Sequence, residues 1–414
     1  MATKKRKKKR LLIILGAGSS LELGMPSVAQ IDSEMKAWSA AFSNTRAATD
    51  IFLALWDSIQ TYYDRELKPL LRPIVNYEKV LGEMVELAAW MRPAPHGTTF
   101  RQFIGYDHIP LPEWAGDNTY GPHATINLAL THLLIKLAEH FRLKSLRFLP
   151  PGAEFLRYQT IFNELGREFE LGIYNLNHDA AAVTALPKAF TGFDANGRFD
   201  PTEVHTRRNW GILYHLHGCV YHSLDPADPG SPIRWVAPLT KHHNYGYAVS
   251  SAQEQTQNKS FPRTVLLAGG YKLDQLLNEP FQSLYASLVR HVYQADAIML
   301  GGYGFGDIHV NRALEKRINS TAHRPPIAVI DYSDPKRGDP MEFRHDPWSQ
   351  TLCETFSVRP TSFREPGHTA PPVIGDLIGG KQMEVAESER VAIWHGGFLG
   401  IADALPMLCS HLQS

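Results

Sequence analysis

The chain has 414 residues, of which 43% are hydrophobic and 20% are charged, so it is large enough to bury the cores of two or three domains. This composition excludes an intrinsically disordered protein and a disulfide-stapled miniature domain. Lysine plus arginine and aspartate plus glutamate each number 42, but residues 4–10 read KKRKKKR, and without these seven charges 35 basic residues face 42 acidic ones. We therefore expect nucleic acid to bind only through this tail, and residues 1–10 to be disordered.

The sequence carries no clear targeting, disulfide or metal signal. The apolar run at 11–15 is too short for a signal peptide or a membrane span. Cys219, Cys353 and Cys409 are far apart and odd in number, which argues against a zinc ribbon and a disulfide framework. The histidines at 222, 242 and 243 lack partners at metal-ligand spacing. These features predict a cytoplasmic protein with no membrane segment and no metal.

Hydrophobic periodicity predicts alternating strands and helices around a long helical stretch. A buried strand is expected at 11–15, and a helix from about Ser19. Helices are expected within 28–168, most clearly at 51–63, 76–90 and 124–141, with a long irregular connection at 92–123. Further strands are expected at 169–176, 210–217, 264–270, 297–303 and 327–333, with a helix at 273–294.

This order predicts an α/β fold, a Rossmann-like doubly wound parallel sheet with a large helical insertion. Residues 11–27 and 169–333 form the expected core, 28–168 the insertion, and 334–414 a C-terminal extension that packs on the core. The tryptophans at 38, 56 and 90 are expected in the core or in a subunit interface. Ligands bind where parallel strands end, so the segments after the strands are the candidate site.

The segment after the first strand reads GAGSSLELGMP (16–26). Gly16 permits a tight turn, and Gly18 lets a pyrophosphate approach the backbone at a helix N-terminus. The alternative is a tight strand–helix turn that binds no ligand.

Polar residues follow two later strands. The amide of Asn177 can bond to a ribose hydroxyl or a water, and Asp179 can orient the loop; an ordinary Asx-rich turn is the alternative. His217 precedes a glycine at a strand end and suits proton transfer near neutral pH. His215 is the alternative base.

Together with GGYGFGD (301–307), these segments resemble the motifs of bacterial sirtuin-like (Sir2-type) NAD-binding proteins, in the family's order. The residues that match the family's opening motif are Gly16, Ala17, Gly18, Ser20, Gly24 and Pro26. The resemblance implies that NAD is the substrate and that Asn177 and His217 are catalytic. The further NAD contacts that it implies are Asp179, Gly302, Tyr303, Gly304, Asp307 and Asp331. For Asp331, a buried capping role is the alternative.

Two departures from deacetylating sirtuins narrow the implied activity. Ser27-Val28-Ala29 replaces the family's Asp-Phe-Arg, and the four-cysteine zinc module is missing. The resemblance then points to the anti-phage defence branch, whose members hydrolyse NAD to nicotinamide and ADP-ribose and so deplete it. The alternatives are a sensor that binds NAD or ADP-ribose without turnover, and a protein deacylase or ADP-ribosyltransferase. The resemblance also suggests a HerA-type hexameric ATPase as partner, and we expect a homo-oligomer built through the insertion.

Overall fold

The computed structural model describes residues 8–44, 50–68, 72–91, 121–149, 151–225, 233–247, 263–268, 276, 278–320, 323–336, 346–365, 367 and 369–414. The chain folds into two compact units. Residues 1–25, 144–217 and 280–414 form the first, which we call the sheet unit; residues 26–143 and 218–279 form the second, which we call the helical unit. The expected insertion had different bounds: 144–168 group with the sheet unit, and 218–279 group with the helices.

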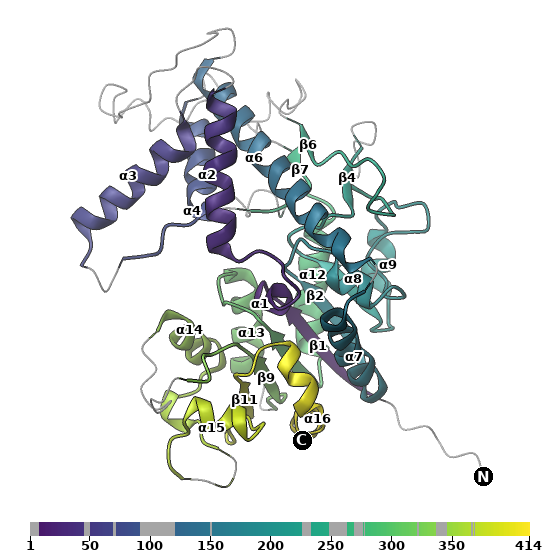
Figure 1. The fold of residues 1–414 in the computed structure, drawn as a ribbon. Coiled ribbons are helices and arrows are strands. Elements are labelled where there is room, and N and C mark those ends of the chain that lie inside the picture. Colours follow the sequence, from purple (N-terminus) through teal and green to yellow (C-terminus); the bar gives the residue numbers. More distant parts are fainter. Residues whose placement is uncertain are drawn as a thin grey trace. The chain divides into compact units, whose positions relative to one another are not determined.

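The sheet unit is built on a seven-stranded sheet with the strand order β10-β11-β9-β8-β1-β2-β3 (Figure 1). Its strands are β1 (Lys9–Leu15), β2 (Phe169–Asn175), β3 (Ile212–His215), β8 (Ala297–Gly301), β9 (Ile327–Ile330), β10 (Glu384–Ala386) and β11 (Val391–Trp394). All neighbouring strands are parallel except β10, which is antiparallel to β11. The predicted Rossmann-like doubly wound sheet is therefore confirmed.

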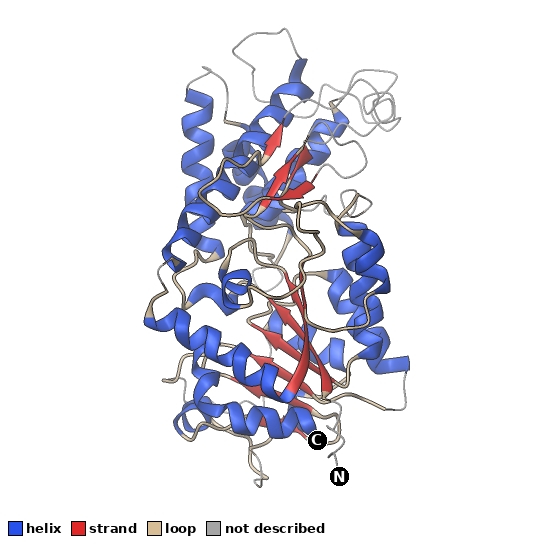
Figure 2. Ribbon diagram, turned by 90° about the vertical axis from the view of Figure 1, so that its right-hand side faces the viewer, coloured by secondary structure: helices blue, strands red, loops and turns tan. Residues whose placement is uncertain are grey.

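The central strand shows why this sheet forms. Residues 11–15 of β1 are fully buried, as expected for a continuous apolar run with neighbours on both faces of a parallel sheet. Helices cover both sides of the strands (Figure 2). The helices of this unit are α1 (Gly18–Leu21), η2 (Leu146–Phe148), α7 (Ala153–Glu168), α8 (Ala181–Ala185), α9 (Pro201–Thr206), α12 (Phe281–Gln294), α13 (Ile308–Ser320), α14 (Pro347–Phe356), η3 (Pro360–Ser362), α15 (Ile374–Gly379), η4 (Leu399–Ala404) and α16 (Leu405–Gln413).

The helical unit holds the helices that the sequence predicts before residue 145. They are α2 (Val28–Asn44), α3 (Ile51–Glu66), α4 (Tyr77–Trp90) and α6 (Gly121–Ser145), the last of which ends in the sheet unit. Two small antiparallel sheets belong to the same unit: β4 (His222–Leu224) with β5 (Ile233–Trp235), and β6 (Gly246–Tyr247) with β7 (Arg263–Thr264). Most of the predicted connection, residues 92–120, lies outside the described residues.

Local capping explains where two of these helices begin. Ser27 Oγ accepts from the Gln30 N–H, and Gln30 Oε1 accepts from the Ser27 N–H, so a reciprocal capping box precedes α2. Asp50 caps α3 by accepting from the Leu53 N–H at 3.0 Å. Trp38, Trp56 and Trp90 are each half-buried.

The structure corrects three predictions. Residues 264–270 do not form a strand of the main sheet: only Arg263–Thr264 are extended, as β7, and residues 265–268 are buried without strand pairing. Apolar character alone therefore marked a buried segment and not a strand. The expected disordered tail is too long at its end, because Lys9 and Arg10 already pair with β2, whereas residues 1–7 lie outside the described part of the chain. The C-terminal extension contributes β10 and β11 to the sheet itself. No helix among the described residues is long and apolar enough to cross a membrane.

Candidate functional site

The candidate site lies where the strand order of the sheet unit reverses. From β1 the chain proceeds outward through β2 and β3 on one side, and through β8, β9 and β11 on the other. In doubly wound sheets, dinucleotides bind beyond the strand C-termini at this switch point. The loops that leave β1 and β8 meet there: Gly16 N–H donates to Gly301 O at 2.9 Å, and Gly18 N–H donates to Gly302 O at 3.0 Å.

Close packing of these two loops requires glycine. A Cβ on Gly16 would lie 2.6 Å from Gly302 O, and a Cβ on Gly18 would lie 2.7 Å from Gly302 Cα. Gly302 itself has a positive φ of 58°, and its Cβ would lie 2.2 Å from Ser19 N. These contacts give the glycines a reason that is independent of any ligand. The predicted approach of a pyrophosphate to Gly18 stays a prediction.

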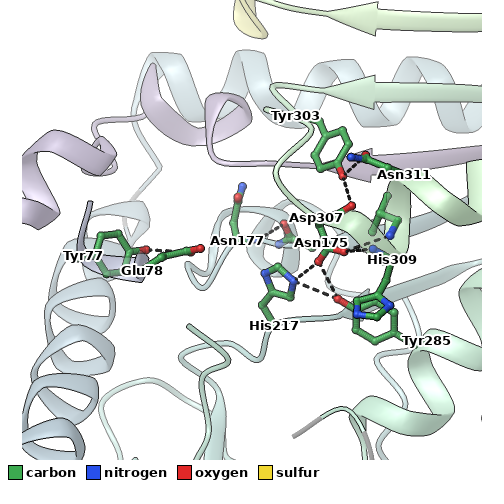
Figure 3. A network of polar contacts seen from close by, with 11 residues as sticks. Tyr77, Glu78, Asn175, Asn177, His217, Tyr285, Tyr303, Asp307, His309 and Asn311 are labelled. Atoms are coloured by element: carbon green, nitrogen blue, oxygen red, sulfur yellow. Dashed lines mark hydrogen bonds and ion pairs between the residues drawn. The ribbon is translucent and has the colours of Figure 1, made fainter. Parts of the chain in front are cut away.

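Asn177 ties the loop after β2 to the glycine loop. Its Nδ2 donates to Gly16 O at 2.9 Å and to Ser19 Oγ at 3.0 Å (Figure 3). The side chain is 8% exposed. Its Oδ1 accepts no hydrogen bond from the described residues. The amide donor is therefore used for the fold, and the amide oxygen remains for a ribose hydroxyl or a water.

Asp179 supports the same loop from within the fold. Its Oδ2 accepts from Ser20 Oγ at 2.8 Å, and its Oδ1 accepts from the Ala181 N–H at 2.8 Å. Burial raises the pKa of this carboxyl above its usual range, and the two hydrogen bonds oppose that shift. Asp179 is 1% exposed, so these contacts make it a loop-positioning residue. Its predicted contact with NAD stays a prediction.

His217 follows β3 and is held by a carboxylate. Its Nε2 lies 2.7 Å from Asp307 Oδ2 and 3.1 Å from the Tyr285 hydroxyl (Figure 3). An ionised carboxylate accepts a proton but cannot donate one, so Nε2 carries the hydrogen and the lone pair lies on Nδ1. This tautomer makes Nδ1 the atom that can receive a proton.

Asp307 is fixed in turn by the start of α13. Its Oδ1 accepts from the N–H groups of His309 at 2.9 Å and Val310 at 3.1 Å, as an N-cap. Tyr285 donates its hydroxyl hydrogen to Asp307 Oδ2 at 3.0 Å. Burial, and then the nearby Asp307 charge, raise the pKa of Tyr285, so this phenol stays protonated and keeps donating.

Tyr285 is a functional candidate that the sequence analysis missed. It lies on α12, within an ordinary amphipathic pattern, and no motif marks it. The contacts of Asp307 also differ from the predicted ones, because in this structure they are with His217, Tyr285 and α13. Its predicted contact with the cofactor stays a prediction.

The structure favours His217 over His215 as the base. His215 is 1% exposed, and burial lowers its pKa to about 4. Its Nδ1 lies 3.3 Å from Asn177 O, so it packs beneath the loop. The strand register pairs Asn175 with His215, and Asn177 and His217 therefore each lie two residues beyond a paired position. Neighbouring strands thus bring the two predicted catalytic residues to the same edge.

The loop after β8 contributes Tyr303 and Gly304. The Tyr303 hydroxyl donates to Asn311 Oδ1 at 2.7 Å and to Asp307 O at 3.0 Å, which closes the loop onto α13 (Figure 3). Gly304 differs from Gly16 and Gly18, because no atom lies within 4 Å of the position of its Cβ. This glycine therefore has room beside it, where a bound molecule could lie.

The remaining predicted residues lie at the margins of this edge. Gly24 has a positive φ of 78°, and its carbonyl accepts from Arg147 at 2.9 Å. Pro26 is the first residue of the helical unit. Asp331 follows β9, and its main chain bonds to Trp394 and Gly397, which extends the pairing toward β11. Ala17 is exposed in the glycine loop.

The residues at this edge fit a dinucleotide better than a metal. Within the described residues, no group of three histidine, cysteine, aspartate or glutamate side chains is arranged to hold a metal ion. Instead, the edge offers glycine backbone, an amide oxygen and an oriented imidazole. These groups suit hydroxyls, phosphates and a proton transfer.

Comparison with known families agrees with this geometry. Residues 172–349 match the family model described as the SIR2-like domain. The match includes Asn177, His217 and Asp307, and it begins after the glycine loop. No curated protein matches the chain. The match supports a Sir2-type family member and NAD-dependent activity.

Proposed function

We propose that this protein is an NAD hydrolase that converts NAD to nicotinamide and ADP-ribose. The observation that carries the proposal is the pairing of Asn177 with an Asp307-oriented His217 at the switch point of a SIR2-like domain. An amide and an oriented base are the groups that hydrolysis of an N-glycosidic bond requires. No metal or covalent nucleophile is needed for this reaction.

The proposed chemistry balances with water as the only co-reactant. The bond between ribose C1′ and the pyridinium nitrogen breaks, and its electron pair leaves with neutral nicotinamide. Water adds to the oxocarbenium-like carbon, and its proton passes to Nδ1 of His217. Asn177 Oδ1 orients this water or a ribose hydroxyl, which lowers the entropic cost of the addition.

Asp307 and Tyr285 prepare His217 for this step. The carboxylate holds the hydrogen on Nε2 and stabilises the imidazolium that forms when Nδ1 takes the proton. The Tyr285 hydroxyl hydrogen bonds to the same carboxylate oxygen and fixes its position. A base of this kind contributes about 10²–10⁴ to the rate.

The biological role that we propose is anti-phage defence by NAD depletion in the cytoplasm. Its support is the resemblance to defence effectors together with the cysteine content, since a four-cysteine zinc module cannot be built from Cys219, Cys353 and Cys409. A destructive NAD hydrolase requires a trigger, and we propose a HerA-type hexameric ATPase as the partner that provides it.

We further propose a homo-oligomer assembled through the helical unit. Several large apolar side chains of that unit are solvent-exposed in the single chain, among them Tyr62 and Ile74, the latter 87% exposed. Exposed apolar side chains are typical of contact surfaces when they gather. Light scattering at micromolar concentration tests this: a mass of several chains is expected, and a monomer would contradict the proposal.

Product analysis tests the proposed reaction. The purified protein is incubated with NAD, alone and with the candidate ATPase, and the products are separated by chromatography. Hydrolysis predicts one nicotinamide and one ADP-ribose for each NAD lost. Cyclic ADP-ribose as the main product would show a cyclase. Turnover only in the presence of an acyl-lysine peptide would show a deacylase, and both results would overturn the proposal.

A further inference from the structure

A cavity of about 390 Å³ lies at the edge of the sheet opposite the candidate site. Its wall includes Lys9, the first residue of β1, and Arg390, which directly precedes β11. Asp296 directly precedes β8 in the same wall. The strand N-termini therefore form this edge, whereas the glycine loops and His217 lie beyond the strand C-termini.

The wall of this cavity is strongly basic. Four permanent cations line it, namely Lys9, Arg317, Arg324 and Arg390, together with His323, and Asp296 is the only carboxylate side chain in the wall. We call this cavity the basic pocket. A local excess of three positive side-chain charges contrasts with the rest of the chain, which is acidic beyond the tail.

Hydrogen bonds position these cations on main-chain oxygens. Lys9 Nζ donates to Gln413 O at 2.6 Å, and Arg324 Nη1 donates to Phe356 O at 3.2 Å. Arg317 Nη1 donates to His323 O at 3.2 Å. A peptide carbonyl carries no net charge, so these contacts fix the side chains without neutralising them.

The sequence continues this charge directly. Residues 4–8, which read KKRKK, immediately precede Lys9. Five further positive charges thus adjoin, along the chain, a residue of the pocket wall. An array of this density suits a partner that carries a regular series of negative charges.

We infer that the basic pocket binds the phosphate backbone of nucleic acid. Arginine presents a planar fork of donors that matches phosphate oxygens, and three arginines line the pocket. An acidic protein would also seek apolar contacts, and the wall offers few, mainly Pro325 and Pro326. The expected binding is independent of base sequence, because phosphate contacts carry no sequence information.

Binding at this edge leaves the candidate NAD site open. A strand of five to seven residues spans roughly 17–23 Å, which separates the two edges. Nucleic acid at the basic pocket therefore does not compete with NAD, so binding and hydrolysis are separate measurements.

Fluorescence anisotropy with the full chain and a labelled DNA of about 30 nucleotides, single-stranded and duplex, tests the inference between roughly 50 and 300 mM salt. Wild-type protein should bind at low salt with a steep salt dependence. Arg317→Gln combined with Arg324→Gln should weaken binding and reduce the log–log salt slope by about 2, one for each lost phosphate contact. Arg317→Lys with Arg324→Lys should retain binding, which shows that charge and not folding is responsible.

The matched control removes the same number of charges from the helix that carries Arg317. Arg312 and Lys316 lie on α13 outside the pocket wall, so their double change to Gln should leave the slope near the wild-type value. Three results would overturn the inference: no binding at the lowest salt, an equal loss in this control, or binding of poly-glutamate as tight as that of DNA. None of these depends on NAD hydrolysis, so the proposed activity stands or falls separately.

Discussion

Asp307 Oδ2 lies 2.7 Å from His217 Nε2, and the two side chains are only 6% and 8% exposed. The other oxygen of the same carboxylate caps α13. One side chain thus joins the candidate base to the rigid start of a helix. Changes at position 307 should therefore alter catalysis through the orientation and tautomer of His217.

Asp307→Asn should lower kcat by about 10²–10⁴ and change KM little. The amide oxygen can still cap α13, but its NH₂ group would face Nε2 and shift the histidine hydrogen to Nδ1, the atom that must receive a proton. Steady-state kinetics together with thermal melting checks this. Tyr285→Phe serves as the milder control, because it removes one donor and keeps the carboxylate. An unchanged kcat in Asp307→Asn would show that the contact does not serve catalysis.

Asn177→Ala should abolish NAD hydrolysis and also lower stability. The change removes the donor to Gly16 O and Ser19 Oγ, and leaving buried acceptors without a donor costs about 1–3 kcal/mol. Denaturant unfolding measures the second effect, and the assay is run at a temperature where the variant is folded. Hydrolysis at the wild-type rate by folded variant would remove Asn177 from the mechanism.

The glycines should divide into two classes. Gly18→Ala should destabilise the fold by about 1–3 kcal/mol, because its Cβ would meet Gly302 Cα at 2.7 Å. Gly304→Ala should leave the melting temperature near that of the wild type, since nothing surrounds its Cβ. A raised KM for NAD in Gly304→Ala would then report contact with substrate. Equal melting temperatures for both variants would contradict the loop-packing explanation.

Asp179→Asn should become relatively more stable as pH rises. Burial raises the pKa of Asp179 in the folded state, so the folded protein holds this proton more tightly than the unfolded chain. The wild type therefore loses stability as pH rises through that pKa, whereas the asparagine variant does not. Melting temperatures of both proteins across the acidic to neutral pH range measure the difference. A wild type that gains on the variant with rising pH would show the opposite sign.

Strong local patterns make the centre of the fold predictable. The continuous apolar run of β1 and the polar residues after β2 and β3 are enough to predict that Gly16, Asn177 and His217 lie at one sheet edge. The fully buried segment 265–268 was wrongly predicted as a strand, because burial and strand pairing leave the same apolar signature. Strands β10 and β11 have only three and four residues, too few for a periodic signal.

Long-range contacts account for what the sequence did not reveal at the site. Tyr285 and Asp307 are separated from His217 by 68 and 90 residues, and only the fold brings them together. The loop-packing role of Gly18 likewise depends on Gly302, far along the chain. A motif identified the glycine, but its contact partner is a property of the sheet order.

The most direct test of the central claim is the rate of nicotinamide release from NAD by wild-type protein and His217→Ala. Both are assayed with the candidate ATPase present, and both must first show the same melting temperature. The proposed mechanism predicts one ADP-ribose per nicotinamide from the wild type and a rate about 10²–10⁴ lower for the variant. Equal rates of release from the two proteins would contradict the assignment of His217 and, with it, the proposed mechanism.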